Sequence, residues 1–445
     1  MVGGGLAGCE AAWALAERGV RVTLREMRPV KMTAAHQTDR LAELVCSNTF
    51  KSVEPTNAHG LLKAEMRRLG SLVLQAADEA RVPGGAALAV DRAAFADAVQ
   101  RRVLAHPNIT VERGEVAELP SPGIVATGPL TSDALAGAIA RRLGVTSLAF
   151  FDAIAPIVAA ESLEMDRLFR ASRYGKGGGD DYLNAPLTRD EYEAFVAALV
   201  AGEQHRPHHD FDQTPYFEAC LPIEEMAARG RDTLRFGPMK PVGLQDPRAG
   251  DRGQAYAVVQ LRQEDRAAQM WNLVGFQTRL KIPEQQRILR TLPGLGRAEF
   301  LRYGSIHRNS YINAPAALTP HLSTRDDPML LFAGQLTGVE GYTESAGTGL
   351  LAGINLARII AGDAPLVPPP TTMLGALYRY LREADASHFQ PMNANFGLVE
   401  PLAEAVPDKA RRKERLVERA LRDIERFADE IGATKNAECG VRNAE

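Results

Sequence analysis

Cysteine is scarce in this chain of 445 residues, which has only four. They are Cys9, Cys46, Cys220 and Cys439, and no two share a CxxC spacing, so neither a zinc site nor a disulfide framework is expected. Long hydrophobic runs are missing too, since no stretch approaches the ~20 apolar residues that cross a bilayer. The net charge is only −3, which argues against a globally polycationic nucleic-acid binder. These absences predict a cytoplasmic protein without a metal or a membrane segment.

The composition is that of an ordinary globular protein, with 45% hydrophobic and 24% charged residues. The chain is too long for one simple core and fits at least two domains. Its charge is unevenly distributed, because residues 206–308 carry 16 Lys and Arg against 12 Asp and Glu. A slightly basic central segment in an otherwise acidic chain suggests a local contact with an anionic partner.

The chain opens with a glycine turn. Gly3–Gly8 reads GGGLAG and satisfies GxGxxG, in which glycines let backbone amides approach a pyrophosphate at a helix N-terminus. A helix is expected over Cys9–Arg18, followed by a short apolar strand that leads to Glu26, where the acidic ribose ligand of a βαβ unit belongs. The motif alone is weak, because a purely structural turn also satisfies it. Only two residues precede it, so we expect the natural start several residues upstream.

A second glycine-rich stretch lies more than three hundred residues later. Residues 329–357 read MLLFAGQLTGVEGYTESAGTGLLAGINLA, which predicts a strand, a glycine turn and a helix. Between the two stretches, a strand at 124–126 runs into a Thr-Gly turn. A nicotinamide dehydrogenase needs only the first turn, whereas FAD also needs a late segment around its ribityl chain and isoalloxazine. The pair therefore predicts bound FAD. The candidate cofactor-binding residues are Gly3, Gly4, Gly5, Leu6, Ala7, Gly8, Glu26, Thr127, Gly128, Gly334, Gln335, Gly341, Tyr342 and Glu344.

The middle of the chain differs from its ends. From about 150 to 310, glycine and proline split short apolar runs, which is typical of an inserted α+β domain. The predicted fold is α/β, a Rossmann-like FAD-binding domain interrupted by that insertion. The expected domains are 1–180 and 311–370 for FAD binding, 181–310 for the insertion, 371–432 for C-terminal helices packed on the FAD domain, and 433–445 for a disordered tail. Further helices are expected at 61–80, 92–105, 132–143, 372–384 and 408–430.

Two of the cysteines have polar surroundings. Cys46 lies in LVCSNTFKS, where hydrogen-bond donors and Lys51 favour a thiolate, and Cys220 precedes an expected helix start in YFEACLPIEE. Either thiol can equally be a buried filler, so the local sequence leaves both readings open. The histidines at 205, 208 and 209 lack a fourth ligand at a zinc spacing, and no metal is expected. The basic run at 409–426 is better read as a solvated helix face than as an RNA contact.

Twelve stretches, spread over nearly the whole chain, resemble one family. They are VGGGLAGCEAAW, LVCSNTFKS, VATGPLTS, RYGKGG, DDYLNAP, FEACLPIEEMAARG, FGPMKPVGL, YAVVQLRQE, VGFQT, FLRYGSIHRNSYINAP, FAGQLTGVEGYTESAGTGLLAGINLAR and FQPMNANFGL. The family is that of the bacterial folate- and FAD-dependent tRNA uracil-5 methyltransferases, called TrmFO. The chain departs from the family pattern in its short first strand and in RYGKGGG, which has one glycine more than expected.

The resemblance implies methylation of C5 of uridine 54 in the T loop of tRNA. The one-carbon unit would come from methylenetetrahydrofolate and pass through reduced FAD, with NADH or NADPH as the reductant. The two cysteines characteristic of the family correspond to Cys46 and Cys220. Uracil C5 becomes nucleophilic only after a thiolate adds at C6, and we expect Cys220 to add there because it lies in the basic insertion. Cys46 would protect the flavin-bound carbon or act as general acid or base, although the two roles could be reversed.

Two further hypotheses concern how the substrates are held. Tyr342 is expected to stack on the flavin, the folate or the target base. Arginine and lysine residues within 229–308 are expected to hold RNA phosphates, which places the tRNA and folate on the side of the insertion. The expected partners are the tRNA T arm, folate and NAD(P)H, with no membrane and no stable protein partner.

Two alternatives stay open from the sequence. One is the related FAD-dependent enzyme that modifies the tRNA wobble uridine, which is a longer protein and lacks the FEACLPIE and FQPMNANFGL stretches. The other is a tRNA-binding flavoprotein without catalytic activity, against which Cys46 and Cys220 argue. Methyl transfer from folate separates both from the main prediction.

Overall fold

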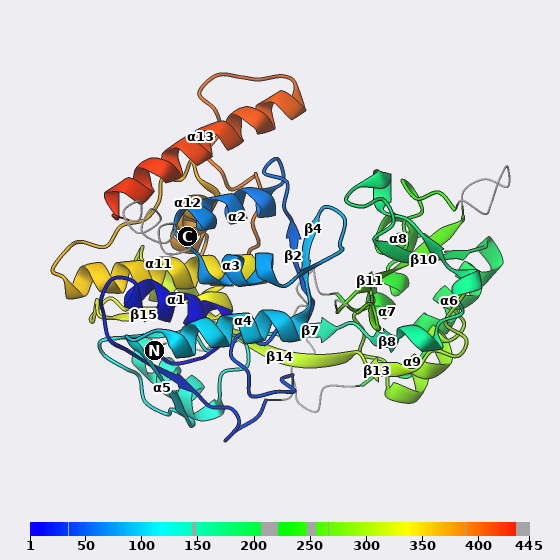
Figure 1. Ribbon diagram of the computed structural model, residues 1–445, viewed down its shortest axis with the longest axis horizontal. Helices are drawn as coiled ribbons and strands as arrows, with labels where there is room; N and C mark the ends of the chain where they lie inside the picture. Colours follow the sequence, from blue (N-terminus) through cyan, green and yellow to red (C-terminus); the bar gives the residue numbers. More distant parts are fainter. Residues whose placement is uncertain are drawn as a thin grey trace, which may run out of the picture.

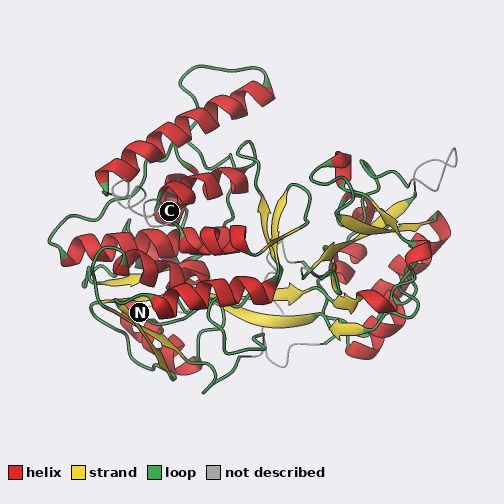
Figure 2. Ribbon diagram, viewed as in Figure 1, coloured by secondary structure: helices red, strands yellow, loops and turns green. Residues whose placement is uncertain are grey.

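The computed structural model describes residues 1–33, 35–144, 148–205, 221–246, 255–265, 267–387 and 389–432, with the side chains of 148–154 and 305–310 left aside. Two bodies lie side by side (Figures 1 and 2). The core of the larger body gathers buried residues between Val2 and Ile139 and between Tyr311 and Ile431. The smaller body has its own core between Val158 and Ala298. None of the described helices combines the length and apolar character needed to cross a bilayer.

A parallel sheet forms the centre of the larger body, and a small antiparallel sheet, ordered β2-β4-β3, lies beside it. The strands are β1 (Val22–Glu26), β2 (Thr49–Ser52), β3 (Arg81–Val82), β4 (Ala87–Val90), β5 (Ile109–Arg113), β6 (Gly123–Val125) and β15 (Leu330–Phe332). β1 pairs with β5, and β6 pairs with β15, both in parallel. Val2 joins the two pairs, because it bridges Arg25 in β1 and Val125 in β6. Val2 thus lies between β1 and β6, directly ahead of the glycine turn.

Helices cover this sheet (Figure 2). They are α1 (Leu6–Ala16), α2 (Ala58–Arg68), α3 (Leu72–Glu79), α4 (Arg92–Ala105), α5 (Asp133–Leu143), α10 (Ala314–Ala317), α11 (Tyr342–Ile360), α12 (Met373–Glu383) and α13 (Lys409–Glu430), with a short 3₁₀ helix at Gly334–Thr337. The helices predicted at 92–105, 132–143, 372–384 and 408–430 are confirmed. The single helix predicted at 61–80 is wrong, because Gly70 takes a φ of 83° and Ser71 caps a new helix by accepting from Leu74 N.

Two glycines bring α1 and α11 into unusually close contact. A Cβ on Gly349 would lie 2.2 Å from the Ala7 carbonyl oxygen, and one on Gly353 would lie 2.5 Å from the Ala11 carbonyl oxygen. The GTGLLAGIN sequence is therefore required by backbone packing. The contact packs α1 directly against α11, although the sequence motifs of these two helices lie more than three hundred residues apart.

The smaller body is a six-stranded antiparallel sheet with helices. Its strands run in the order β13-β8-β12-β11-β10-β9. Their bounds are β8 (Ile157–Ala159), β9 (Phe169–Arg170), β10 (Tyr182–Leu187), β11 (Ala257–Gln263), β12 (Met270–Leu273) and β13 (Phe300–Arg302), and the helices are α6 (Arg189–Ala201), α7 (Ile223–Ala228), α8 (Thr233–Phe236) and α9 (Ile282–Leu289), with 3₁₀ turns at Ala160–Ser162, Met165–Arg167 and Arg173–Gly175. Because β8 and β9 belong to this sheet, the smaller body takes in residues that the expected boundary at 181 assigned to the FAD-binding domain.

Two long strands connect the bodies. β7 (Leu148–Ile154) and β14 (Ser305–Tyr311) pair with each other in antiparallel register, from Ser305 with Ile154 to Tyr311 with Leu148. The chain therefore enters and leaves the smaller body along adjacent strands (Figure 1). This is the arrangement of an insertion into an otherwise continuous domain.

Candidate active site

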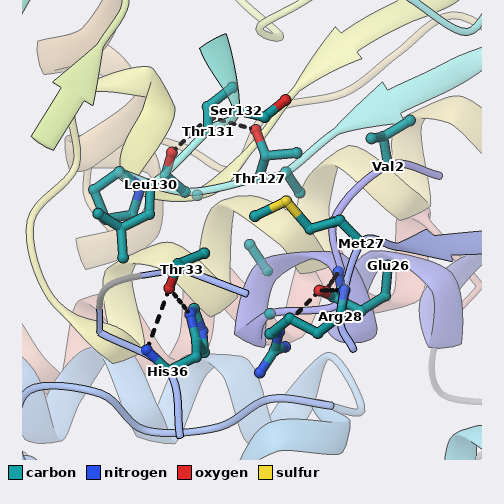
Figure 3. Close-up of a pocket in the computed structure, with 18 of the residues that line it drawn as sticks. Val2, Glu26, Met27, Arg28, Thr33, His36, Thr127, Leu130, Thr131 and Ser132 are labelled. Atoms are coloured by element: carbon teal, nitrogen blue, oxygen red, sulfur yellow. Dashed lines mark hydrogen bonds and ion pairs between the residues drawn. The ribbon is translucent and has the colours of Figure 1, made fainter. Parts of the chain in front are cut away.

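A pocket opens at the edge of the parallel sheet where its strands end (Figure 3). Its empty volume is about 1030 Å³ and continues into open solvent. The predicted site residues that line it are Gly3, Gly4, Gly5, Leu6, Ala7, Glu26, Thr127, Gly128, Gly334, Gln335 and Tyr342. The fold therefore brings the early glycine turn, the Thr-Gly turn and the late glycine segment to one cavity.

The glycine turn serves two distinct purposes. Gly3 and Gly8 are required by packing, because a Cβ on Gly3 would lie 2.5 Å from Ala126 O and one on Gly8 would lie 1.8 Å from Gly3 O. Gly5 instead has no atom within 4 Å of its Cβ position, and it precedes α1 without a side-chain cap. An uncapped helix N-terminus with an open approach is suited to bind a phosphate group.

Glu26 ties the turn to the end of β1. Its carboxylate accepts from Gly4 N at 2.8 Å, from Arg28 N at 3.0 Å and from Arg28 Nε at 2.9 Å. Burial would raise the pKa of Glu26, but the Arg28 guanidinium beside it holds that pKa below its usual value. Figure 3 shows this ion pair on one side of the pocket, near Thr33 and His36, and the Thr127–Ser132 turn on the other.

His36 also lines the pocket, although no sequence motif pointed to it. Its Nδ1 lies 2.6 Å from Thr33 Oγ1. Burial, together with the positive charge of Arg28, lowers the pKa of His36 to about 4. The imidazole is therefore neutral at physiological pH.

Tyr342 begins α11 and links the pocket to Cys46. Its hydroxyl accepts from the backbone N–H of Cys46 at 2.8 Å and from that of Ser47 at 3.0 Å. Burial, and then the nearby Cys46, raise the pKa of Tyr342 far above its usual value. The tyrosine thus remains a neutral phenol, and it fixes the cysteine loop to the rim of the cavity.

Arg92 holds the same loop from the other side. Its guanidinium donates to Leu44 O at 2.6 Å and to Cys46 O at 3.3 Å. Its Nε forms an ion pair with Glu264 of the smaller body at 2.5 Å, and the Glu264 side chain is only 1% exposed. The other Glu264 oxygen has no hydrogen-bond partner among the described residues.

Further contacts cross the seam between the bodies at this loop. Arg262 of β11 donates to Ser47 Oγ at 2.9 Å and to Asn48 Oδ1 at 2.8 Å. The Asn48 amide donates in turn to Gln263 O at 2.8 Å. Both bodies therefore determine where the backbone of Cys46 lies.

Three arginines act on the Cys46 thiol through their charge. Arg92, Arg262 and Arg302 all interact electrostatically with this thiol, and Lys51, the cation expected from the sequence, acts on Glu344. The side chain of Arg302, on β13, forms no hydrogen bond or ion pair with any described residue, and burial followed by the nearby Arg92 lowers its pKa. Such an environment is typical of reactive cysteines.

Gly341 and Glu344 lie behind the pocket and do not line it. Glu344 accepts from His59 Nδ1 at 3.1 Å and from Ala394 N at 2.9 Å. A Cβ on Gly341 would lie 2.3 Å from the Glu344 carboxylate. These two residues therefore fix the start of α11 against α2 and the segment around Ala394. Their role in cofactor binding stays a prediction.

Cys220 lies outside the described residues, so its distance from Cys46 is not part of this geometry. The basic RYGKGGG turn is described, and its charges have partners: Arg173 donates to Lys240 O at 2.9 Å, and Lys176 pairs with Glu54 at 2.7 Å. The turn thus forms a second contact between the bodies.

The fold and the site define a Rossmann-type dinucleotide-binding protein with an inserted α+β domain. A solved structure of GidA from Aquifex aeolicus shares this fold, with a TM-score of 0.67 and 16% identity over 99% of this chain and 76% of that chain. The family model "Glucose inhibited division protein A" matches residues 1–364.

Curated relatives are far more similar in sequence. A protein of Geobacter sulfurreducens named "Methylenetetrahydrofolate--tRNA-(uracil-5-)-methyltransferase TrmFO" is 58% identical over 96% of this chain and 98% of the relative. A protein of Geotalea uraniireducens with the same name is 57% identical over 96% of this chain and 97% of the relative. The chain therefore belongs to the TrmFO family, within the wider GidA family.

Proposed function

We propose that this protein is a methylenetetrahydrofolate–tRNA-(uracil-5-)-methyltransferase that holds FAD in the pocket and methylates uridine 54 of the tRNA T loop, with NADH or NADPH as reductant. Its relatives carry the name of this enzyme. The observation that supports the reaction best is the position of Cys46, which Tyr342 fixes at the pocket rim between the two bodies. A tRNA substrate agrees with the cytoplasmic location expected from the sequence.

The pocket residues fit FAD. The uncapped start of α1 and the open approach at Gly5 suit a pyrophosphate, and Glu26 lies where a carboxylate can bind ribose hydroxyls. Gly334, Gln335 and Tyr342 line the side that would receive the ribityl chain and ring. When bound, the flavin would supply the carrier for the folate carbon and the reducing equivalents for the methyl group.

The chain itself supplies the activation of uracil. A thiolate must add at C6 before C5 can attack a carbon electrophile, and a base must then remove the C5 proton. We assign the addition to Cys220, in the insertion, and the acid–base or protective role to Cys46. The arginines around Cys46 would favour its thiolate form and stabilise the negative charge that develops on the uracil.

Absorption and methyl transfer test the function directly. The purified protein should be yellow, should bleach with NADH or NADPH, and should move a labelled carbon from methylenetetrahydrofolate to C5 of uridine 54 in a tRNA transcript. Transcripts with uridine 54 or the wobble uridine replaced by cytidine serve as matched controls. Labelling that survives loss of uridine 54 and disappears with the wobble uridine would favour the wobble-modifying enzyme; a coloured protein that labels neither would favour the non-catalytic alternative.

Trapping tests the two cysteines. A tRNA with 5-fluorouridine at position 54 should form a covalent adduct with the wild type and with Cys46→Ala, but not with Cys220→Ala. An adduct that persists in Cys220→Ala and is lost in Cys46→Ala would reverse the two roles. Full methylation activity in a variant with both cysteines replaced by alanine would show that neither cysteine is required for catalysis.

A further inference from the structure

Helix α13 lies across the outside of the larger body (Figure 1). Its buried side is formed by Leu416, Val417, Ala420, Ile424, Phe427 and Ala428. Polar contacts also anchor it: Arg68 pairs with Glu425 at 2.9 Å, Thr371 donates to Asp423 at 2.6 Å, and Arg419 donates to Pro401 O. All of these anchors lie from residue 416 onward, so the first two turns of the helix extend beyond its packed part.

The charges of α13 are arranged against the helix dipole. Residues 409–415 contain five Lys and Arg and one Glu, whereas residues 416–430 contain three Arg and five Asp and Glu. Cations near a helix N-terminus and anions near its C-terminus both oppose the dipole. This arrangement does not serve the stability of the helix, which suggests that it serves the binding of something else.

The basic residues of this end have few partners within the protein. Lys409, Arg411 and Arg412 form no side-chain hydrogen bond or ion pair with a described residue, and Arg415 approaches Glu404 only to 3.8 Å in an exposed contact. By contrast, the Arg419 guanidinium donates to Pro401 O at 2.9 Å. Among the described residues, Arg422 is a single unpaired cation in the second half of the helix, whereas Lys409, Arg411 and Arg412 cluster in its first two turns, which we call the basic end of α13 (residues 409–415).

One loop connects the basic end to the candidate active site. Lys413 Nζ lies 5.7 Å from the centre of the Phe396 ring. Two residues before Phe396, Ala394 N donates to Glu344 in the first turn of α11, the helix that begins with Tyr342. In Figure 1 the basic end is the orange end of α13, which lies on the side of the smaller body.

We propose that the basic end of α13 binds the ribose–phosphate backbone of the same tRNA whose uridine reacts at the seam. The inference rests on the proposed function. Exposed cations free of internal partners complement a phosphate backbone, and each phosphate contact makes RNA affinity more dependent on salt. The surface would fix the position of the RNA and would not select its sequence.

The chain offers a matched control for the experiment. Arg411→Gln/Arg412→Gln removes two charges from the basic end, and Arg422→Gln/Arg426→Gln removes two exposed charges from the other half of the same helix. Equilibrium binding of an unmodified tRNA transcript is measured over a range of salt concentrations, together with methylation kinetics. The first variant should bind tRNA about tenfold more weakly near physiological salt, and its slope of log K against log salt should be shallower by about 1.5–2.

The kinetic signature follows from the position of the surface. KM for tRNA should rise in the first variant while kcat, KM for folate and the flavin spectrum stay unchanged, and the control variant should resemble the wild type throughout. Equal effects in both variants, or no effect in either, would overturn the proposal. If the wild type transfers no methyl group but the two variants still differ in tRNA binding, the proposed reaction fails and the binding surface stands.

Discussion

The two ends of the pocket are built in different ways. The end near Gly3–Gly8 is made of backbone, with glycines that permit close contacts and a helix N-terminus without a cap. The end near Cys46 is made of side chains, with Arg92, Arg262 and Glu264 contributed from both bodies. The first end depends on close backbone packing and the second on side-chain contacts between the two bodies. At the first end a substitution should therefore act on stability where the glycine is packed and on cofactor binding where it is open; at the second end it should change the position of a reactive group or the charge around it.

The largest effect is expected at Gly8. In Gly8→Ala the new Cβ would lie 1.8 Å from Gly3 O, so the turn must shift, and we expect unfolding to become easier by about 3–5 kcal/mol. Thermal unfolding measures this. The matched variant Gly5→Ala places its Cβ in open space and should keep its stability, but should bind FAD roughly 10- to 100-fold more weakly because the methyl crowds the pyrophosphate. A destabilised Gly5→Ala, or a Gly8→Ala as stable as the wild type, would contradict the division of roles.

The second effect concerns the seam. Arg92→Met leaves Glu264 buried without its cation, which should cost about 3 kcal/mol of unfolding free energy and reduce methylation. Adding Glu264→Leu should restore much of the stability but not the activity, because Leu44 and Cys46 still lack the donor that held them. Denaturant unfolding and turnover are compared in a double-mutant cycle. Recovery of activity along with stability would show that Arg92 does not position the loop.

Arg302 should show the opposite pattern. Because its side chain has no hydrogen-bond or ion-pair partner among the residues that the structure describes, Arg302→Met should leave the melting temperature within a few degrees of the wild type. Its loss should nevertheless slow adduct formation with 5-fluorouridine tRNA by about tenfold, since one cation near Cys46 disappears. Arg302→Lys should recover part of the rate. A fall in stability with an unchanged adduct rate would make Arg302 a structural residue.

The smallest effect is expected at His36 and depends on pH. The unfolded chain binds a proton on this histidine below about pH 6.5, whereas the folded protein binds it only below about 4. Between these values the unfolded state holds more protons, so stability falls as the pH is lowered. His36→Gln should remove about 1–2 kcal/mol of this acid-dependent loss between pH 6.5 and 4. If the stability of the wild type and of His36→Gln changed with pH in the same way, His36 would not be the cause of the acid-dependent loss.

Features that depend on local sequence were predictable, whereas features that depend on distant contacts were not. The α/β class, the helix at 92–105 and the meeting of Gly3–Gly8 with Gly334 followed from local patterns, because glycine turns and apolar periodicity act over a few residues. No local sequence pattern predicts the role of Arg92, because this role depends on Glu264, which lies 172 residues away in the chain. The break at Gly70 was missed because the apolar pattern continues across it in Leu69 and Leu72.

The residues predicted to form the site fall into two groups, those that line the cavity and those whose side chains contact other segments. Those recognised by their motif, such as Gly5 and Tyr342, line the cavity. Glu344 shares a motif with them, but its side chain points to His59 and Ala394, a direction that spacing alone does not determine. A motif thus identified the segment, whereas the role of each side chain within it depended on partners from elsewhere in the chain.

The paired strands β7 and β14 have a consequence for how such an enzyme could arise. Leu148 and Tyr311 are direct neighbours across the pair, so deleting everything between them leaves two ends that a short turn can join. An ancestral nucleotide-binding protein could therefore have acquired the smaller body in a single genetic event without breaking its own sheet. The same junction is a practical place at which to exchange that body for the equivalent one of a relative and ask which half selects the nucleotide to be modified.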